Sequence, residues 1–164
     1  MSIYTLKCVN WKTEVQHFFI FWCMISVNLA TPVRIVQLEK VEIHFHEHNI
    51  SEVFAKDGIV VSRADVLEIR KHNLEQFNGE RFFSLVNLLD SGKMVEMEAD
   101  AQQLTSSAEF AKQMYAKAIC VKSLGFRLIV NRYLKFFRPK VETKVFNSRE
   151  AAVQWFISKM TDHN

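Results

Sequence analysis

Three histidines recur at every second position of one short stretch, as His44, His46 and His48. On an extended strand alternate side chains share one face, so these imidazoles would follow one another at about 6.6 Å, given a rise of about 3.3 Å per residue. Two of them could hold one zinc or copper ion if a third ligand came from elsewhere in the fold. However, the alternating Ile43 and Phe45 are expected to be buried, and the face of the strand opposite them should be polar in any case. We therefore interpret the histidines as a solvated strand face and predict no metal site.

Basic side chains form the second pattern that could support a function. Arg127, Lys135 and Arg138 follow one another at spacings of eight and then three residues, which places them on one stripe of a helix. Three further lysines extend this basic stripe: Lys122, Lys140 and Lys144. The stripe could bind an acidic protein or a phosphorylated ligand, and the simpler alternative is a solvated helix face. Because the aromatic residues of the same helix should point inward, base stacking is disfavoured and no nucleic-acid partner is expected.

Residue patterns typical of catalysis are absent from the sequence. It contains no phosphate-binding loop, no dinucleotide-binding glycine motif, no nucleophile elbow and no HExxH zinc motif. Glu96 and Glu98 lie close together, but the sequence places no histidine or lysine to work with them. Paired carboxylates near a helix start more often favour the helix dipole than take part in chemistry. We predict no catalytic residue, no cofactor and no enzymatic activity.

Length and composition limit the elements that can position these residues. The chain has 164 residues, 49% hydrophobic and 24% charged, as expected for one globular domain. Its formal net charge of +3 is too small to indicate a nucleic-acid partner by itself. Cys8, Cys23 and Cys120 show neither CxxC nor zinc spacing, which favours free thiols in a reducing compartment and a cytoplasmic protein. Cys120 lies in an apolar strand and is expected to be buried and inert.

Residues 1–32 precede the regular pattern and include an apolar run at 18–29. This run is shorter than the roughly 20 residues of a membrane-spanning helix, and its flanks are unlike those of a signal peptide. Three alternatives stay open: a dispensable leader, with translation starting at Met24, a segment packed on the domain, or a membrane anchor. A membrane is expected as a partner only in the third case. The domain itself is placed at 33–164.

From residue 33 onward the hydrophobic periodicity predicts alternating strands and helices. Strands are expected at 41–46, 50–55, 82–89, 116–121 and 141–146, with a short apolar lead-in at 59–61. Helices are expected at 62–77, at 99–104 continued by 106–114, at 124–138 and from 148 onward. The first two strands should form a hairpin, and the later alternation implies right-handed crossovers between parallel strands. The predicted fold is an α/β, mixed but mostly parallel sheet of about five strands packed with about four helices.

Each expected helix boundary has a cap or a breaker. These are Ser62 with Asp65, Asn78-Gly79, Ser106 with Glu109, Pro139, and Ser148. The residues expected to face the core are Val66, Leu67, Leu74 and Phe77 in the first helix. In the helix at 124–138 they are Phe126, Ile129, Val130, Tyr133, Leu134, Phe136 and Phe137, and in the last helix Ala152, Val153, Phe156, Ile157 and Met160.

Several stretches resemble a known family. They are VEIHFHEHNI at 41–50, SLVNLL at 84–89, Ala116-Lys117-Ala118, and LKFFRPKVETKVFNSREAAVQWF at 134–156. In the last stretch the order and spacing match at Phe136, Pro139, Lys144, Phe146, Ala151 and Trp155. Together these stretches resemble small uncharacterised bacterial proteins that are similar to STAS domains, the fold of the anti-sigma-factor antagonists. The resemblance covers 41–160 and implies a STAS-like fold, in which a β-hairpin precedes alternating helices and strands.

The resemblance also implies where a partner would bind. In STAS-type antagonists, a partner kinase phosphorylates a serine at the start of the helix after the third strand. Ser91 is the candidate phosphosite here, although it stands before the helix, whose first positions are Glu98, Ala99 and Asp100. The implied partner-binding surface is Asp90, Ser91, Glu98 and Asp100, and the basic stripe is a second candidate. An acidic helix start could also mimic a permanently charged state.

The function expected first is a non-catalytic STAS-like module that regulates or binds another protein, and a second copy of the chain is one candidate partner. The alternative is a protein that binds or senses a small anionic or apolar ligand between its helices and its sheet. The two differ in whether the region 90–100 is an exposed loop or the lip of a pocket.

Overall fold

The computed structural model describes residue 29 and residues 31–161 of the chain. The predictions about residues 1–28, which include most of the apolar run as well as Cys8 and Cys23, therefore lie outside the described residues. Within the described part, no helix combines the length and the apolar character that crossing a bilayer requires.

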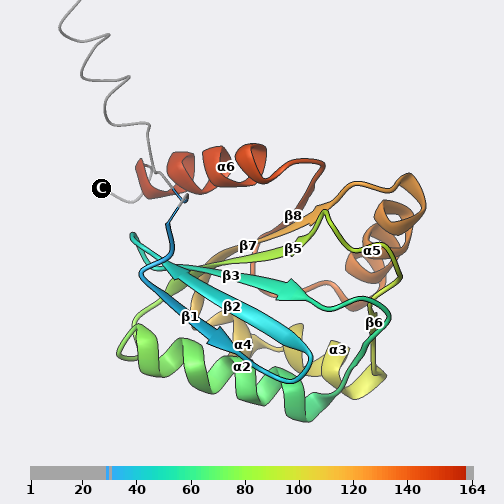
Figure 1. Cartoon of the computed structure of the whole chain (residues 1–164), viewed down its shortest axis with the longest axis horizontal. Helices are drawn as coiled ribbons and strands as arrows, with labels where there is room; N and C mark the ends of the chain where they lie inside the picture. Colours follow the sequence, from blue (N-terminus) through green and yellow to red (C-terminus); the bar gives the residue numbers. More distant parts are fainter. Residues whose placement is uncertain (1–28, 30, 162–164) are drawn as a thin grey trace, which may run out of the picture.

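Six strands form the central sheet, in the order β1-β2-β3-β5-β7-β8 (Figure 1). Their bounds are β1 Arg34–Gln37, β2 Val41–His46, β3 Ile50–Ala55, β5 Phe82–Leu88, β7 Met114–Val121 and β8 Thr143–Phe146. β1, β2 and β3 pair antiparallel, whereas β3, β5, β7 and β8 pair parallel. The prediction of a mixed, mostly parallel sheet that begins with a hairpin is confirmed. The additional edge strand β1 was not predicted, because it has only four residues and its side chains are mostly exposed.

A second, small sheet pairs β4 (Val60–Val61) with β6 (Glu96–Met97) in parallel. The described helices are α2 (Arg63–Gln76), α3 (Ala99–Thr105), α4 (Ala108–Ala111), α5 (Leu124–Phe137) and α6 (Arg149–Thr161). The Glu96 N–H donates to the Ile59 carbonyl and the Glu98 N–H to the Val61 carbonyl, both at 3.0 Å. The end of the segment between β5 and α3 is therefore hydrogen-bonded to the β4 segment that precedes α2 rather than being a free loop.

The helices divide unequally between the two faces of the sheet (Figure 1). α6 lies over one face, which we call the α6 face, and buries Ala152 and Phe156 against Phe83, Leu85 and Ala118. α2, α3 and α4 lie over the opposite face, the α2 face, and α5 packs on the same side beside β7 and β8. Alternate residues of each strand therefore enter different cores, as the pleat of a sheet requires.

The start of α2 forms as its sequence predicts. The Asp65 N–H donates to the Ser62 hydroxyl at 3.3 Å, and the Ser62 N–H donates to the Asp65 carboxylate at 2.7 Å. These reciprocal bonds satisfy two backbone donors that the first turn of a helix leaves free. The helix ends as expected where Asn78 and Gly79 adopt left-handed φ angles of 51° and 77°.

The buried side of α2 differs from the prediction at one residue. Leu67 is exposed, whereas Val66, Asn73 and Phe77 are buried. At 100° per residue these three positions fall within about 40° of one another, and Leu67 lies about 100° from Val66. The helix therefore meets the sheet along a narrow stripe that includes a polar residue and leaves Leu67 outside.

The helix predicted at 106–114 is much shorter than expected. α4 contains only four residues, its N-cap is Ser107 rather than Ser106, and Met114 already belongs to β7. The Phe110 N–H donates to the Ser107 hydroxyl at 3.2 Å. Ser106 does not cap the helix because it is the C-cap of α3 and its hydroxyl is hydrogen-bonded to Tyr133.

Candidate ligand-binding site

A cavity of about 380 Å³ lies between the α2 face of the sheet and the helices that cover it. Its floor includes Val53, Val86 and Ile119, which are register partners on β3, β5 and β7. Its walls include Val66 and Ile69 of α2, Phe110 of α4 and Val130 of α5. Protein interiors are packed with few voids larger than a water molecule, whereas a space of this size falls within the range of small-molecule sites.

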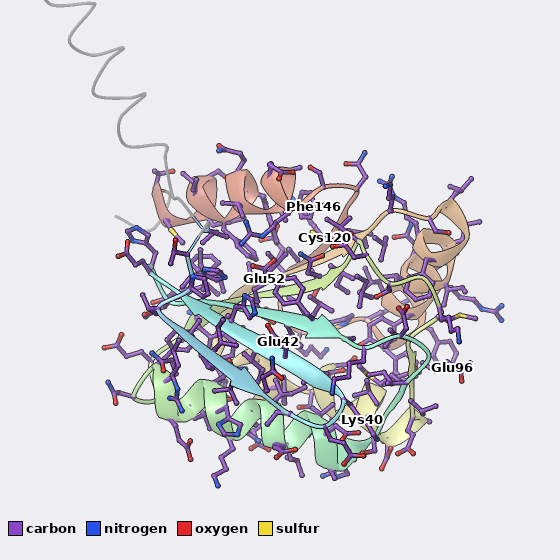
Figure 2. The ribbon with its side chains drawn as sticks, in the orientation of Figure 1. Lys40, Glu42, Glu52, Glu96, Cys120 and Phe146 are labelled. Atoms are coloured by element: carbon purple, nitrogen blue, oxygen red, sulfur yellow. The ribbon has the colours of Figure 1, made fainter. Side chains whose placement is uncertain are left out.

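The mouth of the cavity lies between the segment 94–97 and α5. Three of the residues that line the cavity are exposed and mark this opening: Met94 and Glu96 from the segment, and Ile129 from α5. Glu96 lies at the edge of the molecule beside α5 (Figure 2). The two functions expected from the sequence differ in whether the region 90–100 is an exposed loop or the lip of a pocket. In the structure, residues 94–97 of this region form part of the lip of a pocket.

Polar groups are few among the residues that line the cavity. Ser84 and Lys117 are register partners on β5 and β7, two residues nearer the amino ends of these strands than Val86 and Ile119. Lys117 is half-buried, and no carboxylate of the described residues lies within 4 Å of its ammonium group. Asn73 is buried, and within the described part its side-chain carbonyl has no hydrogen-bond partner. A mostly apolar cavity with a few polar groups is the usual form of a small-molecule site.

One hydroxyl group connects α5 to the rest of the cavity wall. The Tyr133 hydroxyl is hydrogen-bonded to the hydroxyls of Thr105 and Ser106, at 3.0 Å in each case. Phe126 and Val130 add apolar contacts with a small core cluster on the ends of β5 and β7. These contacts hold one side of α5 over the cavity.

The apolar face predicted for the helix at 124–138 is only partly correct. Phe126, Val130 and Tyr133 are half-buried, but Ile129 and Phe136 are exposed, Phe136 by 79%. Leu124 and Leu128, which were not assigned to the core, are exposed by 73% and 62%. None of the residues of α5 is fully buried. The side of the helix that meets the sheet is narrow, and the other apolar residues face outward.

The basic stripe on α5 forms as predicted, since Arg127, Lys135 and Arg138 are all exposed on its outer side. Arg138 is the C-cap of the helix, with a left-handed φ of 44°. Lys144 does not belong to the stripe. It lies on the α6 face, where its ammonium is 3.6 Å from the Glu142 carboxylate and 5.0 Å from the centre of the Trp155 ring.

The acidic candidates and Ser91 occupy separate places. Asp90 is exposed and Ser91 half-buried directly after β5. Glu98 is the N-cap of α3 without a side-chain cap, and the Asp100 carboxylate accepts a hydrogen bond from the Ala101 N–H at 2.7 Å. β6 intervenes between the two pairs, so these residues do not form one continuous loop surface.

Ser91 lies in a second hollow of about 410 Å³, at the carboxyl ends of β5 and β7. Lys93, Lys122 and Ser123, the N-cap of α5, line the same hollow. Ligands of open α/β sheets often bind outside the carboxyl ends of the strands. The two lysines would also place positive charge beside a phosphate on Ser91.

The interpretation of the histidines as a solvated face is wrong for His46. His46 is buried, and its Nε2 lies 3.0 Å from the Glu52 carboxylate. His44 is half-buried, contacts the Glu42 carboxylate and packs its ring 4.7 Å from that of Phe54. His48 is exposed in the turn of the hairpin, with a left-handed φ of 60°. In the described residues no group of three His, Cys, Asp or Glu side chains is arranged to hold a metal ion.

The partner of His46 is the centre of a buried polar cluster on the α6 face (Figure 2). Glu52 is fully buried and accepts two hydrogen bonds from Arg149, at 2.8 and 2.7 Å, and one from Asn87 at 2.8 Å. Arg149 also donates to the backbone carbonyl of Leu29 at 2.9 Å. Burial alone would raise the pKa of Glu52, but the hydrogen bonds from Arg149, His46 and Asn87 outweigh it and lower the pKa to about 2.

All hydrogen bonds of the Glu52 carboxylate are made to side chains of this cluster, whereas the buried Nδ1 of His46 has no hydrogen-bond partner among the described residues. The nearby Cys120 thiol is also buried. Burial, with a smaller contribution from Glu52, raises the pKa of Cys120 to about 12, and its Sγ donates to the Ser148 carbonyl at 3.5 Å. The prediction that Cys120 is buried is confirmed, and the raised pKa is consistent with the low reactivity expected of such a thiol.

A comparison with protein-family models shows the family of the chain. The chain belongs to the family DUF7793, a domain of unknown function, which matches residues 44–159. A similar solved structure is that of an uncharacterised protein of the DUF3478 family from Shewanella loihica PV-4, described as having a SpoIIAA-like fold. It shares 13% sequence identity, with a TM-score of 0.49 over 70% of this chain and 90% of that one. No curated protein matches the chain. The STAS-like order of elements implied by the resemblance, a hairpin followed by alternating helices and strands, is present in the structure.

Proposed function

We propose that this member of the DUF7793 family binds a small ligand that has an apolar body and an anionic end. The observation that carries the proposal is the cavity of about 380 Å³ on the α2 face, with its aliphatic floor and its mouth beside α5. Cavities lined by aliphatic side chains bind apolar molecules readily, because such molecules leave water and gain close contacts. The proposed function is therefore the second of the two expected from the sequence, the binding of a small ligand between the helices and the sheet.

The anionic end of the ligand is inferred from Lys117. Lys117 is half-buried, lines the cavity and is the register partner of Ser84, and no carboxylate of the described residues lies within 4 Å of its ammonium group. A charge held near an apolar surface favours a ligand that brings the opposite charge. A medium-chain or long-chain carboxylic acid has both properties, with a methylene chain for the aliphatic floor and a carboxylate for Lys117.

We propose further that binding occurs without catalysis. Catalytic sites usually contain titratable groups whose pKa values are strongly shifted. Among the described residues, the shifted groups are Lys40, Glu52, Asp65, Cys120, Glu142 and Arg149, and none of them lines the cavity. The shifts of the charged groups arise from ion pairs and hydrogen bonds within the fold.

The proposal is tested by measuring ligand binding in a variant whose cavity is filled. Val86→Phe adds a ring above the centre of the floor, and we expect it to abolish the rise in melting temperature that decanoate causes in the unaltered protein. Val145→Phe is the matched control, because Val145 is the half-buried register partner of Ile119 on the same face but does not line the cavity. Full binding by the Val86→Phe variant, or no binding by the unaltered protein across a series of fatty acids, would contradict the proposal.

A second substitution tests the role of the charge. Lys117→Met keeps the length of the side chain and removes the ammonium group, so we expect decanoate to bind about tenfold more weakly. Decanol, which has the same chain without the carboxylate, should bind equally well to both proteins. Isothermal titration of the two ligands against the two proteins separates the ionic contribution from the apolar one. An equal loss for both ligands would show that Lys117 supports the cavity and does not recognise the anion.

A regulatory role through a protein partner is the second candidate, and the hollow around Ser91 favours it. A phosphate on Ser91 would lie beside Lys93 and Lys122, near the start of α5. Intact-mass measurement of the protein from its native host should show a phosphorylated fraction that Ser91→Ala removes. If the protein were unphosphorylated under all growth conditions, regulation through phosphorylation of Ser91 would be contradicted.

A further inference from the structure

We propose that α5 docks the protein on an anionic membrane surface, with the outer side of the helix at the headgroups. The inference rests on the proposed function only for the cargo, which would be a lipid carboxylate or acyl chain that enters the cavity from that membrane. The docking itself rests on separate observations, made on the outer side of the helix.

The first observation is the exposure of large apolar side chains along α5. Leu124, Leu128 and Phe136 are each more than 60% exposed, and Ile129 is exposed at the mouth of the cavity. On a helix of 3.6 residues per turn these four positions fall on one side, within an arc of about 140°. When an amphipathic helix lies in the plane of a membrane, the apolar side chains on one side of it insert into the boundary between headgroups and acyl chains.

The second observation is the charge around this apolar arc. Between residues 122 and 140 the chain has six cations and no Asp or Glu: Lys122, Arg127, Arg132, Lys135, Arg138 and Lys140. All six are exposed, and none forms an ion pair with a described carboxylate. Arg132 and Lys135 lie within the apolar arc, where their long aliphatic stems can lie along the apolar surface while their charged ends reach the headgroups. Clustered cations of this kind attract the anionic lipids of a bilayer.

The same charges argue against other occupants. A second copy of the chain, docked through the same helix, would bring two groups of six cations together, and like charges oppose that contact. A nucleic acid would satisfy the cations, and Phe136 could stack on a base, but the exposed aliphatic side chains of Leu124 and Leu128 would be left against a polar backbone. An anionic bilayer satisfies both properties at once, because it offers negative headgroups above an apolar layer.

The two sides of α5 connect the membrane with the cavity. Ile129, Val130 and Tyr133 line the cavity from the same helix whose outer side bears Leu128 and Phe136. Met94, on the opposite side of the mouth, is also exposed. A protein that lies on its α5 helix would therefore hold the mouth of the cavity close to the lipid headgroups.

The test measures flotation of the full chain with vesicles of phosphatidylcholine, with and without phosphatidylglycerol. We expect binding to the anionic vesicles only, and its loss at high salt. Arg127→Glu with Lys135→Glu should weaken binding by at least about tenfold. Arg63→Glu with Lys112→Glu is the matched control, because it changes the net charge equally at exposed cations outside α5 and should bind better than the α5 pair.

The contribution of the exposed apolar side chains of α5 to membrane binding is tested with a separate variant and its control. Leu128→Ser with Phe136→Ser should reduce binding to anionic vesicles, whereas Val33→Ser with Leu67→Ser, which alters exposed apolar residues elsewhere, should not. Circular dichroism of each variant verifies that the fold is retained. The inference is overturned if the α5 variants bind as their controls do, if the unaltered protein binds neither kind of vesicle, or if salt has no effect.

The cavity variant separates this inference from the proposed function. Val86→Phe should still float with anionic vesicles but should extract no lipid when solvent extracts of the recovered protein are analysed by mass spectrometry. Flotation without lipid in the unaltered protein would support docking and contradict the proposed cargo. Retained lipid without any flotation would support the cavity and overturn the docking.

Discussion

The two faces of the sheet differ in how closely the helices pack on them. On the α6 face, the small side chains of Ala116, Ala118 and Cys120 let α6 pack closely, and all three are fully buried together with Phe156. On the α2 face, β5 and β7 present Val86 and Ile119, yet the four helices above them leave the cavity. The comparison teaches that one sheet has a closely packed side and an incompletely filled side, and the second is the side proposed to bind a ligand. Three predictions test this difference, and the largest effect is expected on the α6 face.

Glu52→Ala should have the largest effect, because it removes the acceptor that holds Arg149 and His46. Loss of one member of a buried, hydrogen-bonded ion pair costs about 3–5 kcal/mol. Urea unfolding followed by circular dichroism measures the loss in the free energy of unfolding. The neighbouring exposed residue gives the control, since Glu150→Ala should change stability by less than about 0.5 kcal/mol. Similar small values for both variants would show that the buried cluster does not stabilise the α6 face.

The pH dependence of stability should be the next largest effect. The pKa of Glu52 is lowered from 4.5 to about 2 in the folded protein, so its ionised form stabilises the fold at neutral pH by about 3 kcal/mol. This contribution is complete above about pH 5 and is lost as the pH falls toward 2. Unfolding midpoints measured across this range should fall steeply for the unaltered protein and less steeply for Glu52→Gln. The pKa values of Asp65 and Glu142 are also lowered, through Lys40 and Lys159, and both remain as background in the variant.

The smallest effect is expected from a pair of substitutions that enlarge one side chain on each face. Ala118→Val adds volume where α6 packs closely, and we expect it to cost about 1–3 kcal/mol. Val86→Phe adds more volume, but it does so in the cavity and should cost less than Ala118→Val. Thermal unfolding of both variants, without ligand, gives the comparison. A larger loss for Val86→Phe would mean that the α2 face has no space to receive a ligand.

The sequence predicts the order of elements well because that order depends on local signals. The alternation in β2, the capping box at Ser62 and Asp65, and the continuous apolar run of β5 are each contained within a few neighbouring residues. The pairing of β4 with β6 was not predicted, since two-residue strands show no periodicity. The start of α4 was misplaced by one residue because Ser106 and Ser107 are both good caps, and only the contact of Ser106 with Tyr133 decides between them.

The sites were harder to predict because they depend on residues that are distant in the sequence. Arg149 follows Glu52 by 97 residues, and no local pattern joins them. The outward position of Phe136 could not be predicted from periodicity, because apolar residues occupy more than half of the circumference of α5. The cavity could not be predicted from the sequence either, because its aliphatic lining has the same composition as an ordinary hydrophobic core. Lys117, a charged residue within an otherwise mostly apolar strand, is a local signal of the proposed site that the sequence contained.

The hydrogen bond between Arg149 and Leu29 sets a practical limit on how the protein can be shortened. The Leu29 carbonyl accepts from the guanidinium that also binds Glu52, and the Leu29 side chain is buried against α6. A shortened chain that begins after this residue would lack both the acceptor and the side chain, and it would unfold at a lower temperature for reasons unrelated to ligand binding. Deletions made to study the first residues of the chain should therefore end before Leu29, so that the cluster around Glu52 stays intact.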